Sequence, residues 1–150
     1  MVYEWTQGAR KAGLDAQKVG ERLSKIHEKH GLVTADLVVR DARRKASPLH
    51  GGFEWDDTAA ADAYRLYQAR NICNALVISH PTGEGDERMV RAFVHIEEGY
   101  EDIHIVLSVA HKREALLAQA LVELESSRNK YAHLSELAAV FAALDEAQAA

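Results

Sequence analysis

The stretch SPLHGGFEWDD, residues 47–57, constrains the fold most, because it forces the chain to turn between two helices. Pro48 fixes its own φ angle and disfavours the helical conformation at Ser47, so a helix arriving from the N-terminal side should end there. Gly51 and Gly52 then allow backbone angles that other residues avoid, which lets the chain reverse its direction. The stretch therefore predicts a tight junction.

The aromatic and acidic residues of this junction lead into another helix. Phe53 and Trp55 flank a single residue, so an extended segment would point both rings to the same side and against the core. Asp56 or Asp57 can accept hydrogen bonds from the first free amides of the helix that follows. No helix breaker occurs before about Leu76, so we expect one continuous helix up to that residue.

Two further helices are expected before the junction. Asp15 can cap a helix that runs to about His30, where Gly31 would end it. Thr34 can cap a second helix over about residues 35–45. The short connection and its glycine are typical of a helix-turn-helix element. Together with the helix after the junction, these elements predict an N-terminal three-helix unit.

The period of the apolar residues changes after the third helix. A short apolar run at residues 75–79 is followed by a polar turn. Residues 89–96 then alternate, so that Ala92 and Val94 share one buried face of a strand. Residues 102–106 alternate again after a second turn. The pattern predicts a small antiparallel sheet of two or three strands, which needs helices packed on it.

Two C-terminal helices, residues 110–126 and 130–147, carry apolar stripes and predict a helical hairpin. Ser108 can cap the first of them. Whether Ser126 to Arg128 separate the two helices or only bend one long helix stays open. The apolar stripes could cover the sheet, and a helical dimer interface would have the same pattern.

The chain of 150 residues suits one compact domain of the α+β class. It divides into a helical, basic part, residues 1–76, and a part with the small sheet and the C-terminal helices, residues 77–150. Cys73 is the single cysteine, so no internal disulfide can form. The sequence shows neither a signal peptide nor an apolar run of membrane-spanning length. These features predict a cytoplasmic protein without a membrane partner.

Charge is distributed unevenly along the chain. Residues 1–50 hold ten Lys or Arg and six Asp or Glu, a net charge of +4. Residues 51–150 hold eight and seventeen, a net charge of −9. Such asymmetry favours a nucleic-acid-binding part joined to a part with another role, but it also arises by chance in chains of this size.

Basic residues of the second and third helices are the candidate nucleic-acid contacts. Basic side chains on one helix face can contact phosphates, but late basic residues also suit the dipole of a solvated helix end. Two roles for the aromatic residues of the junction also stay open. Trp55 could form a contact surface with the arginines of the third helix, or it could be structural, like Phe53. The predicted phosphate contacts are Arg40, Arg43, Arg44 and Lys45, with Arg65 and Arg70 in support.

No catalytic constellation stands out, so we expect a non-enzymatic protein without a cofactor or a metal. His27 and His30 have no third metal ligand nearby in the sequence. His95 and His104 could face one another across a hairpin, but two histidines alone make a poor metal site. Cys73 lies among apolar neighbours on a helix and should behave as a small hydrophobic residue.

The chain contains four distinctive segments: SPLHGGFEWDD, AYRLYQAR, RAFVHI and KYAHLSELAAVFAALDE. Together they resemble small proteins of unassigned function that tailed phages and prophages encode. The resemblance extends from Gly8 to Asp145. It implies a phage early-region or accessory protein in the cytoplasm of the bacterial host, and it brings no activity or catalytic residue with it.

Two functions follow from these features. The first is a phage accessory protein that binds nucleic acid through its basic N-terminal helices and forms a homodimer through its acidic C-terminal part. The alternative is an acidic interaction protein that inhibits a host defence or nucleic-acid-processing complex by occupying a basic groove on it. The interaction surface of this alternative would comprise Trp55, Glu97, Glu98, Glu101 and Asp102.

Overall fold

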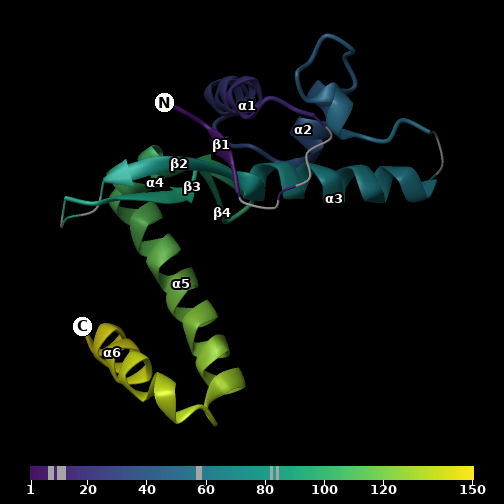
Figure 1. Ribbon diagram of the computed structural model, residues 1–150. Coiled ribbons are helices and arrows are strands. Elements are labelled where there is room, and N and C mark those ends of the chain that lie inside the picture. The colour runs from purple at the N-terminus through teal and green to yellow at the C-terminus, as the bar shows by residue number, and fades with distance from the viewer. Residues whose placement is uncertain (7–8, 10–12, 57–58, 82, 84) are drawn as a thin grey trace. The chain divides into compact units, whose positions relative to one another are not determined.

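The protein forms two compact units, Met1–Ile105 and Val106–Ala150 (Figure 1). Helices and two small antiparallel sheets make up the fold, which confirms the predicted α+β class. The sequence analysis divides the chain after residue 76, whereas the first unit contains both sheets. The computed structural model describes residues 1–6, 9, 13–56, 59–81, 83 and 85–150.

The first long helix, α1 at Ala16–His30, begins and ends where the sequence predicts. The Asp15 carboxylate accepts a hydrogen bond from the Lys18 amide at 2.9 Å and caps the N-terminus. Gly31 ends the helix in the left-handed region at φ 79°, and its amide donates to the His27 carbonyl at 2.7 Å. Both ends are therefore set by residues next to them in the sequence.

The next helix, α2 at Ala35–Ala42, begins as predicted but is shorter. The Thr34 hydroxyl accepts a hydrogen bond from a first-turn amide at 3.1 Å. The chain then turns, because Ser47 Oγ donates to the Asp41 carboxylate at 2.7 Å and draws the following segment back. The prediction that the helix includes the basic residues 43–45 is wrong, since these residues lie in the turns that follow it.

The connection between α1 and α2 pairs with the second sheet. The Val33 amide donates to the Tyr100 carbonyl at 2.6 Å, and the Tyr100 amide donates to the Val33 carbonyl at 2.5 Å. Gly99 allows this approach, because a side chain there would come within 2.8 Å of the Val33 carbonyl oxygen. Contacts from a distant part of the sequence therefore hold this turn in place.

The junction contains a short 3-10 helix, η1 at His50–Gly52, and leads to α3 at Ala59–Ala75. The predicted helix is thus present and ends one residue before Leu76. Of the two expected caps, Asp57 lies outside the described residues, as does the residue that follows it.

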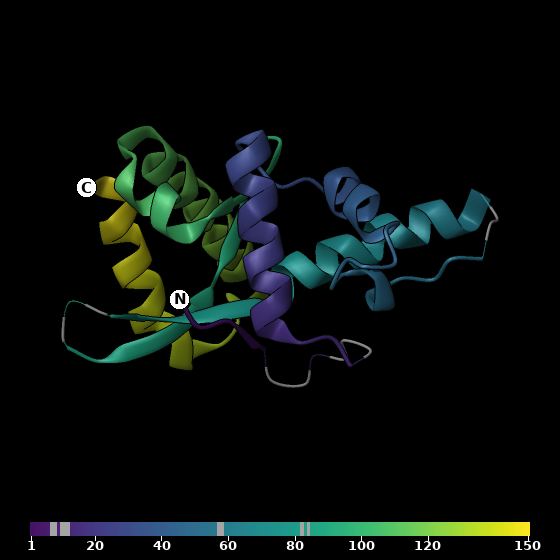
Figure 2. The ribbon, with the colours of Figure 1, turned by 90° about the horizontal axis from the view of Figure 1, so that it is seen from above.

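Both sheets belong to the first unit. The order β1-β2-β3 of the first is antiparallel, and the second pairs β4 with β5. Figures 1 and 2 both show α1 lying over one side of the first sheet. The strands are β1 at Glu4–Trp5, β2 at Leu76–Pro81, β3 at Glu87–Arg91, β4 at Phe93–Ile96 and β5 at Gly99–Asp102.

Tyr3 connects the N-terminal segment to the core of the first unit. Its ring stacks on Phe93 with 6.3 Å between the ring centres. It also lies so close to α1 that a side chain at Gly20 would come within 2.2 Å of the ring. The glycine of α1 is therefore required by packing and not by helix geometry.

The predicted single strand over residues 89–96 is wrong, because the chain changes sheets at Ala92. The Ala92 amide donates to the Leu76 carbonyl at 2.9 Å, and its carbonyl accepts from the Ile103 amide at 3.0 Å. Ala92 and Phe93 are both buried, so the strict alternation of buried and exposed residues stops there. Two shorter strands, β3 and β4, result.

The predicted strand over residues 102–106 is also wrong. It is replaced by α4 at Ile103–Ser108. The Asp102 carboxylate accepts a hydrogen bond from the His104 amide at 2.8 Å, which satisfies one of the free donors at the start of a helix. Ser108, expected to cap the following helix, is the last residue of α4 instead.

The second unit consists of helices, and two of them follow α4. α5 at Ala110–Tyr131 continues through Ser126 to Arg128, so these residues do not separate the helices. The chain turns later, through a short 3-10 helix, η2 at Ser135–Leu137, into α6 at Ala138–Ala149. In α5 and α6, Leu144 is the single buried side chain. None of the described helices has the length and apolar character needed to cross a bilayer.

Candidate nucleic-acid interface

A stripe of basic side chains runs along α1. Lys18, Arg22, Lys25 and Lys29 recur at intervals of four, three and four residues. These intervals place all four on one face of a helix. This stripe is absent from the predicted phosphate contacts, although its helical spacing is visible in the sequence.

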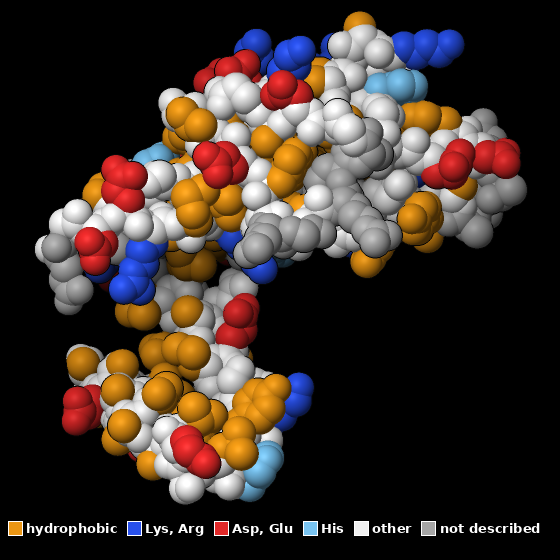
Figure 3. Space-filling view, in the orientation of Figure 1, with side chains coloured by type: hydrophobic (Ala, Val, Ile, Leu, Met, Phe, Trp, Pro, Cys, Tyr) orange, Lys and Arg blue, Asp and Glu red, His pale blue; other side chains and the backbone are white. Residues whose placement is uncertain are grey.

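A groove of about 570 Å³ lies between α1 and α2, and we call it the basic groove. Among the described residues that line it, Asp41 has the single carboxylate, and His30 also lines it. A neighbouring hollow of about 470 Å³ continues along α1 beside Lys18. Figure 3 shows Lys and Arg side chains along the upper edge of the first unit, over these helices. The basic side chains that line the groove are Arg22, Lys25, Lys29, Arg40 and Arg44.

Asp41 lies at the wall of the basic groove and is buried. Its Oδ2 accepts hydrogen bonds from Arg22 Nε at 2.9 Å and from Ser47 Oγ at 2.7 Å. Its Oδ1 pairs with both Arg22 and Arg44. Burial alone would raise the pKa of Asp41, but the hydrogen bonds from Arg22 and Ser47 and the charge of Arg22 outweigh it and hold the pKa below its ordinary value. The ionised carboxylate therefore fixes two arginines at the surface of the groove.

The other predicted contacts on and after α2 are exposed. Arg40 pairs with Asp36 at 2.9 Å, and both side chains are more than 70 % exposed (71 % and 72 %). Arg43 lies 3.4 Å from Asp62, also at the surface. Ion pairs of this kind contribute little to stability, so a phosphate can replace the carboxylate. Lys45 is exposed and makes no side-chain hydrogen bond or ion pair with the described part of the chain.

The structure separates the two supporting arginines. Arg65 has only 1 % of its surface exposed, and it donates to the Asp62 carboxylate at 2.9 Å and to the Asp56 carbonyl at 3.1 Å. A phosphate has no access to it, so the prediction that Arg65 contacts nucleic acid is corrected to a structural role. Arg70 is exposed on α3, and its contact with phosphate stays a prediction.

Trp55 is half-buried and contacts several other side chains. Its ring stacks on His50 with 5.1 Å between the ring centres, and the guanidinium carbon of Arg65 lies 5.0 Å from its centre. Phe53 and Arg43 contact the same ring, at 5.6 Å and 5.8 Å. Its Nε1 donates to the His50 carbonyl at 3.0 Å. These contacts favour the interpretation in which the aromatic residues of the junction are structural.

The acidic residues of the alternative function do not form one surface. Glu97 and Glu98 are exposed in the turn between β4 and β5, with Glu97 at φ 54°. Glu101 is buried, and its Oε2 lies 3.9 Å from His27 Nε2. Asp102 is half-buried at the start of α4. Glu101 is therefore not available to a partner protein, which corrects its assignment to an interaction surface.

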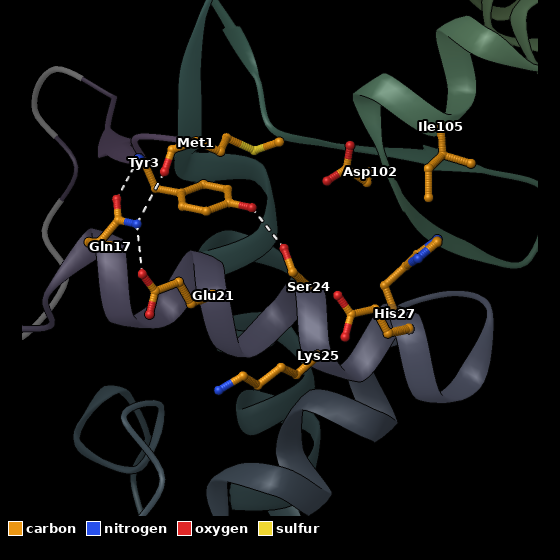
Figure 4. A pocket seen from close by; sticks show the side chains of 10 residues that line it. Met1, Tyr3, Gln17, Glu21, Ser24, Lys25, His27, Asp102 and Ile105 are labelled. Carbon is orange, nitrogen blue, oxygen red and sulfur yellow. Dashed lines mark hydrogen bonds between the residues drawn. The ribbon is translucent and has the colours of Figure 1, made fainter.

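A pocket of about 530 Å³ lies beside α1 near the N-terminus (Figure 4). Glu21, Glu28 and Asp102 line it, and the Tyr3 hydroxyl is hydrogen-bonded to Ser24 Oγ at 2.7 Å. Burial raises the pKa of Tyr3. The hydrogen bond with Ser24 lowers it, and the charges of the three carboxylates raise it, so the pKa of Tyr3 lies above its ordinary value. The pocket is negative and disfavours phosphate, in contrast to the basic groove.

The two histidines that could face one another across a hairpin each contact a different ring. His95 makes an edge contact with Tyr100, with 5.0 Å between the ring centres, whereas His104 lies beside His80 at 5.8 Å. Among the described residues, no three His, Cys, Asp or Glu side chains are placed to hold a metal ion. Cys73 is buried, and burial raises the pKa of its thiol to about 12, so it behaves as the small hydrophobic residue expected.

Comparisons of the chain with protein-family models, with curated proteins and with solved structures give no match. The function is therefore inferred from the side chains of the site.

Proposed function

We propose that the protein is a non-enzymatic accessory protein of a phage or prophage that binds nucleic acid through the basic groove in the host cytoplasm. One observation carries this proposal: five Lys or Arg side chains surround a single buried carboxylate, and two of them already neutralise it. A groove with this excess of positive charge attracts the phosphate backbone of nucleic acid.

The basic groove offers two kinds of cation. Arg22 and Arg44 are held by Asp41, so they meet a phosphate with little further loss of side-chain freedom. Lys25 and Lys29 are exposed point charges on flexible stems. All of these groups suit phosphates and not particular base edges. The proposed binding is therefore largely independent of nucleotide sequence.

The helix-turn-helix-like element of this proposal consists of α1, residues 31–34 and α2. A connection of this length and its glycine support the assignment. The basic groove lies between the two helices, so both of them would contact the phosphate backbone.

The second unit provides the surface for the proposed homodimer. An apolar groove of about 400 Å³ lies between α5 and α6. Figure 3 shows hydrophobic side chains gathered over α6 and the adjoining end of α5. Exposed apolar surfaces can mark interaction sites, and two-fold dimers are the commonest assemblies. The large apolar side chains of this groove include Leu121, Leu124, Tyr131, Phe141 and Leu144.

A fluorescence-anisotropy titration with labelled duplex DNA at several salt concentrations tests the nucleic-acid proposal. The double variant Lys25→Ala/Lys29→Ala removes two cations from the basic groove, and Arg113→Ala/Lys130→Ala removes two from α5 as the matched control. We expect the groove variant to reduce the slope of log affinity against log salt by about 2 and the control to leave it unchanged. Equal slopes for the two variants, or no binding by the unaltered protein, would refute the proposal.

A further inference from the structure

The helix α3 presents two stacked tyrosines to the solvent. Tyr64 and Tyr67 are 51 % and 57 % exposed, and their ring centres lie 6.2 Å apart with 23° between the ring planes. Their spacing of three residues places them on one face of the helix. Arg65, Ala69 and Ile72 are buried on the opposite face. Packing of the first unit therefore does not account for the two exposed rings.

Basic and amide side chains continue this face toward β2. Arg70 and Asn74 follow the tyrosines at helical spacing, and Arg70 is exposed. Arg91 of β3 is also exposed, and its Nη1 donates to Asn74 Oδ1 at 3.4 Å. None of the described α3 side chains on this face is acidic. We call the surface formed by Tyr64, Tyr67, Arg70, Asn74 and Arg91 the tyrosine face.

The chemistry of the tyrosine face suits one class of partner. Arg70 and Arg91 form no ion pair with a carboxylate in the described part of the chain, and such arginines favour a polyanion. Exposed aromatic rings favour flat groups that can stack on them. An unpaired nucleic-acid strand provides both, through its phosphates and its bases. In a duplex the faces of the bases are covered by the neighbouring bases, so the tyrosines could not reach them.

We propose that the tyrosine face binds an unpaired strand of DNA or RNA, whose bases stack on Tyr64 and Tyr67 and whose phosphates pair with Arg70 and Arg91. This inference rests on the proposed nucleic-acid-binding function and adds an unpaired strand as a ligand class. Arg43, which follows α2, pairs with Asp62 on the opposite side of α3. The tyrosine face and the basic groove are therefore separate surfaces that substitutions can test separately.

Anisotropy titrations with labelled single-stranded oligothymidine and with a mixed-sequence duplex test this inference. Tyr64→Ala/Tyr67→Ala should weaken single-strand binding at least about 10-fold, because a base stacked on an aromatic ring contributes about 5- to 150-fold in affinity. Tyr64→Phe/Tyr67→Phe keeps the rings and should keep the affinity. Leu117→Ala in α5 is the control for loss of an exposed apolar side chain, because Leu117 is exposed and does not line the apolar groove, and none of the three variants should change duplex binding.

Several results would overturn the inference: unchanged single-strand binding by the alanine variant, an equal loss by the phenylalanine variant, or an equal loss for duplex DNA. A lower mass of the alanine variant in light scattering would show that a second copy covers the tyrosine face, and would also overturn it. A different result would show that the basic groove does not bind nucleic acid. In that case Lys25→Ala/Lys29→Ala would leave duplex binding unchanged, whatever the effect of the tyrosine variants. A protein that binds neither nucleic acid would overturn both proposals.

Discussion

The guanidinium of Arg65 lies 5.0 Å from the centre of the Trp55 ring and joins the junction to α3. Its Nε donates to the Glu54 carbonyl at 2.5 Å, and its Nη2 donates to the Asp56 carbonyl at 3.1 Å. Its Nη1 donates to the Asp62 carboxylate. Glu54 and Asp56 lie outside helices and strands, so one buried side chain satisfies backbone acceptors that regular structure leaves unpaired.

Removal of Arg65 should destabilise the first unit. Arg65→Ala leaves the Glu54 and Asp56 carbonyls without their donor and opens a cavity beside Trp55, so we expect the free energy of unfolding to fall by about 3 kcal/mol. Arg65→Lys should recover only part of this loss, because an ammonium group lacks the planar fork of donors. Urea denaturation followed by tryptophan fluorescence measures both effects.

Arg70→Ala is the matched control, because it removes an exposed arginine from the same helix. It should change the free energy of unfolding by less than about 0.5 kcal/mol. Equal urea midpoints for Arg65→Ala and Arg70→Ala would contradict the structural role of Arg65.

Local signals explain which parts of the fold the sequence predicts well. The caps at Asp15 and Thr34 and the stop at Gly31 depend on neighbouring residues, and all three are confirmed. The break at Ala92 depends instead on hydrogen bonds to Leu76 and Ile103, which no window of sequence around Ala92 contains. The unbroken alternation therefore predicts one strand where the structure has two.

The candidate site was predictable to a similar extent. The basic stripe that includes Arg22 and Lys25 follows from helical spacing alone, so the sequence holds the signal for half of the basic groove. The burial of Arg65 and Glu101 could not be read from the sequence. Both face partners that the fold brings to them, and charged residues are normally expected at the surface.

The buried carboxylate of Asp41 should be important for stability as well as for the groove. Asp41→Asn leaves Arg22 and Arg44 without their shared anion, and we expect it to reduce the free energy of unfolding by about 2–3 kcal/mol at neutral pH. Asp36→Asn removes the exposed partner of Arg40 and should change it by less than about 0.5 kcal/mol. Comparable losses in the two variants would show that burial of the carboxylate is unimportant.

The effect of Asp41 should depend on pH in a defined direction. Burial would raise its pKa, but the hydrogen bonds from Arg22 and Ser47 and the charge of Arg22 lower it overall. The group therefore stabilises the fold above the ordinary carboxyl pKa of about 4, and this stabilisation is lost as the pH falls through the lower pKa of the folded state. Urea midpoints should show the difference between the unaltered protein and Asp41→Asn shrinking below about pH 4. A difference that grows on acidification would contradict this account.

The thiol of Cys73 should be unreactive until the protein unfolds. Burial raises its pKa from 9.0 to about 12, so at pH 8 the folded protein holds about a thousandfold less thiolate than the unfolded chain. A disulfide reagent such as Ellman's reagent should label the thiol quickly in denaturant and only at the rate of opening in buffer. Rapid stoichiometric labelling of the folded protein would show that Cys73 is accessible.

If the proposed homodimer forms through the apolar groove, one exposed leucine of α5 should be required for dimer formation and another should not. Leu124 lines the apolar groove between α5 and α6, whereas Leu117 is similarly exposed on α5 but does not line it. A buried carboxylate disfavours association, so Leu124→Glu should convert a dimer into a monomer, while Leu117→Glu should leave the dimer intact. Size-exclusion chromatography with light scattering gives the masses, and circular dichroism checks that both variants remain helical. If the unaltered protein is a monomer, or if both variants dissociate equally, the apolar groove is not the dimer interface. Neither result would bear on the proposal that the basic groove binds nucleic acid.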